Sequence, residues 1–441
     1  MHNSPILKRL GLNRPELRAW AMYDWANSAF MTTIVSTIFP IYFNTVAAAN
    51  LTPTQSSFRF ALITSAALII VAMLSPILGA VADLTGTKKK MLGSFLGLGV
   101  TATALMYFVR QGDWQLGAGL FILANIGAAA SLVFYDSLLP HIANHEEMDR
   151  TSTSAYALGY LGGGLLLAIN LAWIQKPDLF RIGSHELAIR FSFLSVAIWW
   201  FCFSIPLFRS VDEPSRLLQP NGSIGIKLFH AAFVRLGSTL SELKNYRNAF
   251  LMMLAFLVYN DGIVTIIRMA TTYGTEIGLT RESLISALLL VQFIGIPFAL
   301  AFGQLAVKIG TKYAVFVGLL GYIVITILAY FMTTTFEFYV LALLVGMVQG
   351  GSQALSRSMF ASMIPRHKSS EFFGFFGIFE KFSGIAGPSI FALMILTTGS
   401  SRNAILSLIL FFVVGAVLLS KVNVEEGQRT AREIEAHAQL G

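Results

Sequence analysis

The chain has 441 residues, of which 55% are hydrophobic and only 12% are charged, and its formal net charge is +8. Soluble globular proteins carry roughly 25% charged residues, so this composition excludes water as the main solvent of the folded chain. The basic residues form short clusters between apolar runs, which is typical of membrane-protein loops and argues against a nucleic-acid-binding protein. The single cysteine, Cys202, excludes an intrachain disulfide and a cysteine-based metal site.

The N-terminal segment, Met1–Arg18, is basic and leads into a long apolar run with no small-residue cleavage site behind it. We therefore expect an uncleaved first span rather than a signal peptide. Apolar runs that approach the roughly 20 residues needed to cross a bilayer then follow one another along the chain. The first six predicted spans are Trp20–Ala47, Phe60–Ala82, Met91–Arg110, Trp114–Leu139, Ser154–Ile174 and Leu187–Phe208.

A polar stretch, residues 210–248, follows the sixth span. Apolar residues in it recur at a spacing of three and four, which predicts a helix along the inner leaflet or, equally, a linker helix packed on neighbouring cytoplasmic loops. These residues are Ile226, Phe229, Phe233, Leu236, Leu240 and Leu243. The remaining six predicted spans are Ala249–Gly274, Ser283–Val307, Tyr313–Thr333, Phe336–Ile364, Phe372–Leu396 and Asn403–Ser420.

These spans predict an all-α membrane protein with twelve transmembrane helices. It divides into an N-terminal six-helix bundle (1–209), the linker (210–248), a C-terminal six-helix bundle (249–422) and a charged tail (423–441) that we expect to be a frayed cytoplasmic helix. Most of the 31 Lys and Arg residues fall in tails and loops on the side of the N-terminus, which predicts that both termini are cytoplasmic. We expect a multi-pass protein of the cell membrane, which in a bacterium is the inner membrane.

A short loop motif occurs twice. GAVADLTGTK, residues 79–88, lies between the second and third spans, and GQLAVKIGTK, residues 303–312, lies between the eighth and ninth. Pro140 and Pro365 follow the fourth and tenth spans at nearly the same offset. Parallel repeats of a six-helix unit describe the two halves of the major facilitator superfamily, whose signature loop the first copy resembles. The residues that we assign to this cytoplasmic gate motif are Gly79, Asp83, Gly86, Lys88, Gly303, Gly310 and Lys312.

The motif has a plausible physical role as a latch. Its glycines allow helices to approach closely. We expect Asp83 to cap a neighbouring helix or to pair with a cation in one conformation only. In the second copy Val307 replaces the acid, so the latch should be lopsided.

Five segments carry a closer likeness: AWAMYDWANSAF (Ala19–Phe30), ALGYLGGGLLL (Ala157–Leu167), YNDGIVTIIRMA (Tyr259–Ala270), QGGSQALSRS (Gln349–Ser358) and EFFGFFG (Glu371–Gly377). They resemble one branch of that superfamily, the bacterial relatives of the fungal autophagy-associated vacuolar amino-acid effluxers. The likeness covers essentially the whole chain. It implies the major facilitator fold, in which the first, fourth, seventh and tenth spans line a central cavity, and an activity related to the release of amino acids.

Charged residues inside the predicted spans are few. Each costs about 2.5–3.5 kcal/mol near the bilayer centre on insertion scales, so each needs a partner or a water-filled cavity. All but the last two lie on the four spans that the resemblance assigns to the cavity. They are Asp24, Asp136, Asp261, Arg268, Arg357, Glu380 and Lys381.

Asp24 and Asp261 are the candidates for proton coupling. Asp24 lies roughly 10 Å and Asp261 roughly 18 Å from the cytoplasmic edge, and we expect the deeper acid to be the better proton carrier. A buried carboxyl group takes up a proton readily unless a cation holds it ionised. Arg268 lies two helical turns from Asp261, too far for direct contact. The alternative is that these acids form structural ion pairs or cap broken helices.

Arg357 lies near the inner end of the tenth span, beside Gln349 and Gln353. Its guanidinium is expected to hold a substrate carboxylate or phosphate, or to lock this span to another helix as a gate. Lys381 and Glu380 point in different directions from one helix, so we expect Lys381 to reach an acid on another span in a structural role. For Asp136 we expect a helix-terminal or loop-pairing role. The other cavity candidates, for most of which packing is the alternative, are Tyr23, Asn27, Tyr156, Tyr160, Tyr259 and Asn260.

We expect no metal and no cofactor. His141 and His145 have the spacing of a metal pair on a helix, but no third ligand is evident, and a solvated loop is favoured over zinc. The sequence contains no nucleotide-binding P-loop, which favours a secondary transporter over an ATP-driven one.

The sequence therefore predicts a monomeric carrier, not an enzyme, in which two halves rock about a midplane site in the lipid bilayer. We expect it to move a small polar organic solute, amino acids first, with proton coupling through Asp261 or Asp24. One alternative is an exporter of hydrophobic drugs or lipids, whose cavity should be mostly apolar and open between helices. Another is a non-transporting membrane receptor or enzyme.

Overall fold

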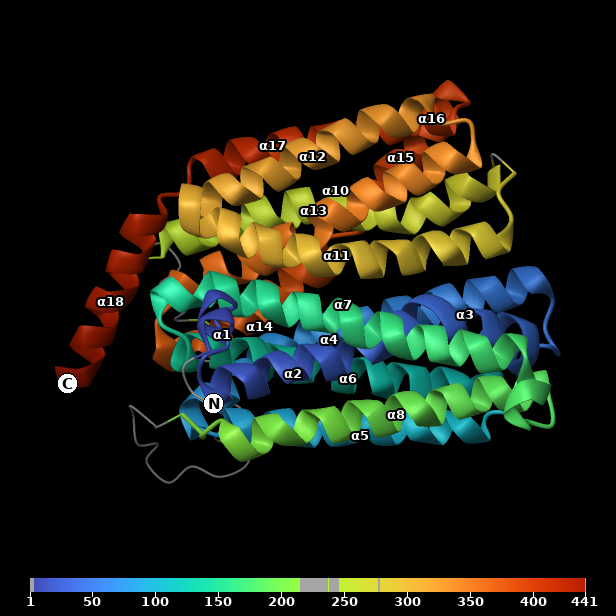
Figure 1. Cartoon of the computed structure of the whole chain (residues 1–441), viewed down its shortest axis with the longest axis horizontal. Coiled ribbons are helices and arrows are strands. Elements are labelled where there is room, and N and C mark those ends of the chain that lie inside the picture. Colours follow the sequence, from blue (N-terminus) through green and yellow to red (C-terminus); the bar gives the residue numbers. More distant parts are fainter. Residues whose placement is uncertain (1–3, 215–236, 238–245, 277, 441) are drawn as a thin grey trace.

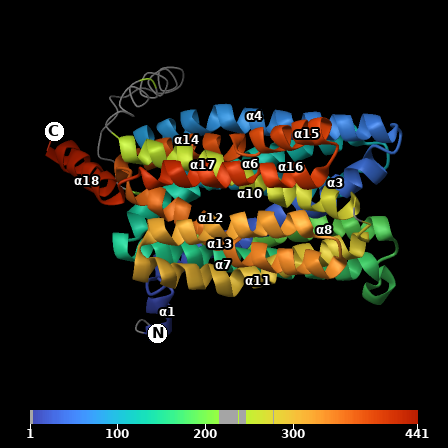
Figure 2. The same ribbon diagram turned by 90° about the horizontal axis from the view of Figure 1, so that it is seen from above.

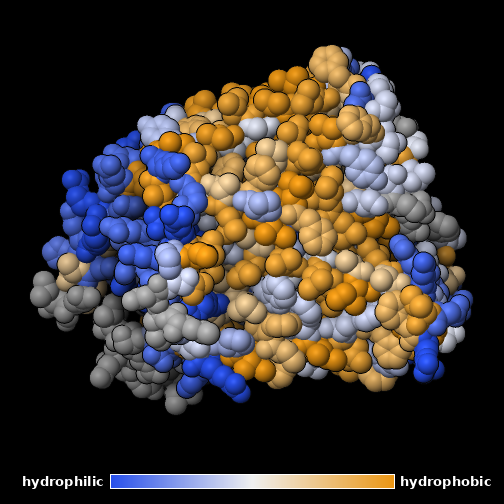
Figure 3. All heavy atoms as spheres, viewed as in Figure 1, coloured by the Kyte–Doolittle hydropathy of each residue, from blue (hydrophilic) through white to orange (hydrophobic). Residues whose placement is uncertain are grey.

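The computed structural model describes residues 4–214, 237, 246–276 and 278–440, and all regular structure among them is helical. Twelve helical segments in this part of the chain are long and apolar enough to cross a membrane. Figure 3 shows a broad apolar band across the face in view, with polar surface at both ends of it. The predicted all-α membrane fold is confirmed.

The first six spans form one half of the molecule, and Figure 1 shows it beside the second half. The first span is continuous but changes its winding along its length, because π-helical segments interrupt the α-helix. The six spans are α2 with η1, α3 and η2 (Pro15–Ala29, Phe30–Ile38, Phe39–Tyr42, Phe43–Ala47), α4 (Pro53–Thr85), α5 (Lys88–Leu105), α6 (Trp114–Ile142), α7 (His145–Gln175) and α8 (His185–Ser210).

The second six spans repeat the arrangement, with the last two each divided into two helices. They are α10 (Arg247–Glu276), α11 (Arg281–Ile309), α12 (Thr311–Phe331), α13 (Thr335–Ser362), α14 and α15 (Ser369–Phe382, Ala386–Thr398), and α16 and α17 (Ser401–Ser407, Ile409–Ser420). The remaining elements are α1 (Pro5–Arg9), the 3₁₀ turns η3 (Met106–Phe108), η4 (Pro177–Phe180) and η5 (Arg366–Lys368), and α18 (Val424–Leu440).

Two pairs of spans join the halves in a pseudo-symmetric way. The fifth span, α7, packs on the eighth, α11, and the eleventh, α14, packs on the second, α4. Figures 1 and 2 show both termini at the same end of the bundle, which we call the terminal end. The repeated loop motifs lie at this end, because they follow the second and the eighth span, and each even-numbered span returns the chain to the end where it started.

Glycines of the motif terminate the spans. Gly86 ends α4 with φ of 60°, and Gly310 separates α11 from α12 with φ of 89°. Both angles lie in the region that side chains with a Cβ rarely adopt, so these sharp turns require glycine.

Three features differ from the sequence-based expectation or lie beyond it. The fifth span begins at His145 rather than Ser154, because an Asn144 capping box with Glu147 starts the helix in the polar loop. The eleventh span is broken: α14 ends at Phe382, Gly384 has φ of 99°, and α15 begins at Ala386. The predicted linker helix through Phe229 and Leu240 lies outside the described residues.

The tail is helical, as predicted, but it is docked rather than frayed. In α18 a Glu435 carboxylate oxygen accepts a hydrogen bond from the backbone nitrogen of Arg366, and the Gln428 amide donates to the Ser362 hydroxyl at 3.2 Å. The buried Ala431 lies on the same helix. The tail therefore contacts the connection between the tenth and eleventh spans.

Candidate functional site

A central cavity of about 360 Å³ lies between the two halves. Side chains from α2, η1, α6 and α7 line one wall, and side chains from α10, α11, α13 and α14 line the other. The cavity thus has walls on the spans that the family resemblance assigned and on the fifth, eighth and eleventh as well. Its polar and charged lining residues are Asp24, Asn27, Ser28, Thr32, Ser36, Thr37, Asp136, Tyr156, Tyr160, Gln292, Gln349, Gln353, Arg357, Glu380 and Lys381.

A three-charge cluster lies at the part of this cavity nearest the terminal end. Arg357 donates from Nη2 to Asp24 Oδ2 at 3.0 Å and from Nη1 to Asp136 Oδ1 at 3.1 Å. Its Nε donates to the Ser152 hydroxyl at 3.0 Å and its Nη2 also to the Ser152 carbonyl at 3.2 Å. All three guanidinium nitrogens are therefore engaged by protein groups.

Aromatic rings enclose the guanidinium. Its central carbon lies 4.8 Å from the Trp20 ring and 4.6 Å from the Tyr156 ring. Ring faces stabilise a cation that has left water. Arg357 and its two acids come from opposite halves, so the cluster locks the tenth span to the first and fourth. Breaking such a buried pair by removing one partner typically costs about 3–5 kcal/mol.

The expectation that Lys381 reaches an acid on another span is wrong. Its Nζ lies 3.2 Å from Oε1 of the neighbouring Glu380. The Glu380 side chain is 42% exposed and that of Lys381 18%, so both are accessible to a molecule in the cavity.

Asp261 lies outside the central cavity. Its carboxylate accepts hydrogen bonds from the backbone nitrogens of Ala386 at 3.1 Å and Gly387 at 2.8 Å, at the first turn of α15. Arg268 donates to the Gly384 carbonyl at 3.0 Å, in the break itself. Asp261 therefore caps a broken helix, which was the structural alternative for this residue.

The two remaining candidates on α10, the seventh span, and Tyr23 also lie away from the cavity lining. Asn260 donates to the Ser383 hydroxyl at 2.6 Å, beside the break in the eleventh span. The Tyr259 hydroxyl bonds to Ser356, and the Tyr23 hydroxyl donates to Ser131 at 2.7 Å. These groups join spans within one half.

Sequence reasoning missed part of the polar wall. Ser28, Thr32 and Ser36 recur every four residues on the first span and face the cavity. This spacing places them on one helical face, a signal that could have identified the wall. The assignment of Asp136 to a helix-terminal or loop-pairing role is wrong, because its partner is Arg357 of the tenth span.

The first copy of the loop motif closes the terminal end. The Asp83 carboxylate accepts hydrogen bonds from the backbone nitrogens of Ser370 at 3.3 Å and Glu371 at 2.8 Å, in the first turn of α14. Its Oδ1 also lies 2.7 Å from Lys88 Nζ. Gly79 permits the contact, because a Cβ there would meet the Ser370 backbone. Asp83 thus both caps a helix and pairs with a cation.

The second copy uses an acid from the other half. Asp149 on α7 accepts hydrogen bonds from the hydroxyls of Thr311 and Ser358. A Cβ on Gly303 would meet the Thr153 side chain. Lys312 of this copy donates to the Val422 carbonyl at 2.7 Å and to that of Ser420 at 2.8 Å, so it has no role equivalent to that of Lys88.

His141 takes part in the contact between the first copy of the loop motif and the start of α14. Its Nε2 lies 3.1 Å from Lys88 Nζ and 3.3 Å from the Ser369 hydroxyl. The expectation of a solvated loop is therefore wrong for His141, although His145 is exposed.

Comparisons with known proteins agree with this architecture. The model of a family described as vacuole effluxer Atg22 like matches residues 51–432. The uncharacterized MFS-type transporter YxiO of Bacillus subtilis is 37% identical over 409 residues, which cover 92% of this chain and 94% of that protein. Autophagy-related protein 22 of Saccharomyces cerevisiae (strain S288c) is 23% identical over 512 residues and covers 98% and 96% of the two chains.

Two solved structures share the fold. The proton:xylose symporter XylE superposes with a TM-score of 0.73 at 13% identity, covering 96% of this chain and 98% of its own. FucP in its outward conformation gives a TM-score of 0.63 at 13% identity, with 92% and 98% covered.

Proposed function

This chain belongs to the vacuole effluxer Atg22-like family of the major facilitator superfamily, and we propose that, as a secondary transporter, it moves a small polar organic solute through the central cavity by alternating access. Amino acids are the first class to test. The observation that carries this proposal is the charged lining of the cavity between the halves. In the proposed orientation the terminal end faces the cytoplasm.

The cavity charges suit a zwitterion. Among the described residues its lining holds three carboxylates, Asp24, Asp136 and Glu380, and two cations, Arg357 and Lys381. Because protein groups engage every nitrogen of Arg357, we assign the solute carboxylate to Lys381 instead. The solute ammonium group then lies against Asp136 or Glu380, which supply the surplus negative charge.

Proton coupling follows from two acids sharing one guanidinium. When the halves separate at the terminal end, Arg357 moves away with the second half and leaves Asp24 and Asp136 in the first. A carboxylate without a counter-ion in a low-dielectric site favours its protonated form. We therefore assign coupling to Asp24, together with Asp136, in preference to Asp261, whose carboxylate caps α15.

Uptake by proteoliposomes under an imposed pH gradient tests both points. We expect the gradient to drive amino-acid uptake by the wild type, and Asp24→Asn or Asp136→Asn to abolish this drive. Asp261→Asn serves as the comparison: its amide oxygen keeps one of the two backbone hydrogen bonds that the carboxylate accepts, and we expect the gradient still to drive uptake. Loss of coupling in Asp261→Asn alone would overturn the assignment.

Lys381→Gln tests the solute contact. The loss of a charge-assisted hydrogen bond is worth about 1.5–3 kcal/mol, so we expect KM to rise roughly ten- to hundred-fold. Lys368→Gln, outside the cavity, is the control. The five charged side chains also argue against the mostly apolar cavity expected of an exporter of hydrophobic drugs or lipids.

A further inference from the structure

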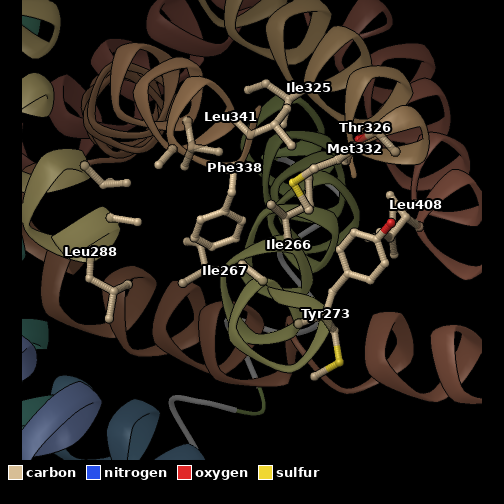
Figure 4. Close-up of a pocket in the computed structure, with 18 of the residues that line it drawn as sticks. Ile266, Ile267, Tyr273, Leu288, Ile325, Thr326, Met332, Phe338, Leu341 and Leu408 are labelled. Atoms are coloured by element: carbon tan, nitrogen blue, oxygen red, sulfur yellow. The ribbon is translucent and has the colours of Figure 1, made fainter. Parts of the chain in front are cut away.

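A second cavity lies wholly within the C-terminal half, beside the central one. Figure 4 shows its side chains converging from α10, α12 and α13, with Phe338 and Ile267 on one side of the space and Tyr273 on another. Its volume is about 110 Å³. We call it the side cavity.

The side cavity is almost entirely apolar. Ile266, Leu341 and Leu408 are among the side chains that line it. The hydroxyl of the buried Tyr273 has no hydrogen-bond partner among the described residues. An enclosed apolar cavity of about 150 Å³ excludes water and takes up benzene, and the side cavity has a lining of the same kind. The side cavity is therefore suited to a branched alkyl chain or a small ring.

The side cavity adjoins the charged cavity. Ile267, Leu288, Val291 and Gln349 line both spaces, so these four residues form the wall between them. Three of the four are apolar side chains, so a displacement of one of them leaves no polar group unpaired. An apolar group enters most readily through such a wall.

A definite length separates the charge cluster from the shared wall. Gln349, at the shared wall, and Arg357, in the charge cluster, are eight residues apart on α13, which corresponds to roughly 12 Å of helix. A solute whose head group lies near Arg357 and Lys381 reaches the side cavity only with an arm of about this length. Short amino-acid side chains end in the charged cavity.

We propose that the side cavity is a second subsite of the transport site and binds the apolar arm of an amphipathic solute. The charged head of this solute lies near Lys381 and Asp136, and its arm passes Gln349 and ends among Ile266, Phe338 and Leu341. This inference rests on the proposed function and extends it, because it names the substrate class: zwitterions or ammonium compounds with a long alkyl or aryl arm.

A chain-length series tests the proposal. Binding of norvaline, 2-aminododecanoic acid and 2-aminotetradecanoic acid to the full chain in detergent is measured by isothermal titration calorimetry. We expect the dissociation constant to fall about four-fold for each methylene that enters the side cavity. The three compounds share one head group, so the difference between them reports the arm alone.

Filling the side cavity is the matched test. Ala342→Phe places a ring in the side cavity and should remove the gain from the long chains while leaving norvaline binding unchanged. Leu343→Phe is the control, because the neighbouring Leu343 is 38% exposed on the outer face of the same helix. Ala287→Leu fills the cavity from α11 with less added volume, and it keeps the test available if Ala342→Phe does not fold.

The outcomes distinguish the two proposals. If norvaline binds but longer chains bind no better, or if Ala342→Phe and Leu343→Phe behave alike, the second subsite is wrong and the polar transport site stands. If only the long chains bind and Ala342→Phe abolishes that binding, the subsite stands and small amino acids are not the substrates. If no compound binds, both proposals fail.

Discussion

The carboxylate of Asp149 accepts a hydrogen bond from the hydroxyl of Thr311. The second copy of the repeated loop has Val307 where the first copy has Asp83, and it therefore bonds to an acid of the other half. In the first copy, Asp83 belongs to the loop itself and bonds to the start of α14. Both acids therefore belong to the N-terminal half, and the groups that donate hydrogen bonds to them belong to the C-terminal half. The latch is lopsided, as the substitution by Val307 predicted, but it is not missing on one side.

Asp149→Ala should destabilise the protein in the closed arrangement. The change leaves the hydroxyls of Thr311 and Ser358 without their acceptor, which costs about 1–3 kcal/mol when such groups are buried. Thermal unfolding in detergent should show a lower Tm. Asp178→Ala, at an exposed acid in η4, is the control. Equal Tm values for the two variants would contradict the assignment of Asp149 to a latch.

Alanine at the two motif glycines should have unequal effects. A Cβ on Gly79 meets the Ser370 backbone, whereas one on Gly303 meets the Thr153 side chain, which can rotate. We expect Gly79→Ala to cost about 1–3 kcal/mol of stability and Gly303→Ala clearly less. Gly97→Ala, where nothing lies within 4 Å of the added carbon, should leave stability unchanged or increased. Tm measurements on the three variants rank them directly.

Lys88→Met should open the terminal end. It leaves the fully buried Asp83 carboxylate without the ammonium group 2.7 Å away. We expect a cysteine at position 137, introduced in a Cys202→Ser background, to react faster with a hydrophilic maleimide in Lys88→Met, because Ser137 is buried against Ser370 in the closed arrangement. Lys90→Met is the control. An unchanged rate of labelling would show that the latch holds without this ion pair.

Arg357→Met should be strongly destabilising and should be rescued by removing its acids. Alone it leaves two buried carboxylates without a counter-ion, a loss of about 3–5 kcal/mol. Combined with Asp24→Asn and Asp136→Asn, the variant should regain most of its stability but no proton-driven uptake. A triple variant as unstable as Arg357→Met would mean that the guanidinium acts mainly through its contacts with Trp20 and Ser152.

Much of the architecture could be predicted from the sequence because it depends on local and repetitive signals. Apolar runs marked the spans, since crossing a bilayer requires a minimum helix length. The duplicated loop marked the two halves, and Gly86 and Gly310 adopt the positive φ angles that only glycine tolerates well.

The pairing of charges could not be predicted in the same way. Asp24 and Arg357 are 333 residues apart, and no periodic pattern links them. Asp261 was assigned to proton coupling by its depth, but its role depends on the break at Gly384, which brings free backbone nitrogens of the eleventh span to the seventh. Depth is a property of one helix, whereas a partner is a property of the packing of two.

The docked tail has a consequence for any work on the C-terminus. Glu435 holds the backbone of Arg366, the residue that opens the 3₁₀ turn before α14, and α14 begins with the groups that Asp83 binds. A reporter fused to the end of α18, or a protein that binds its last turns, would therefore disturb the contact with the turn before α14. Removal of the tail would remove the hydrogen bond at Arg366, so preparations with and without α18 should differ in how firmly the start of α14 is held.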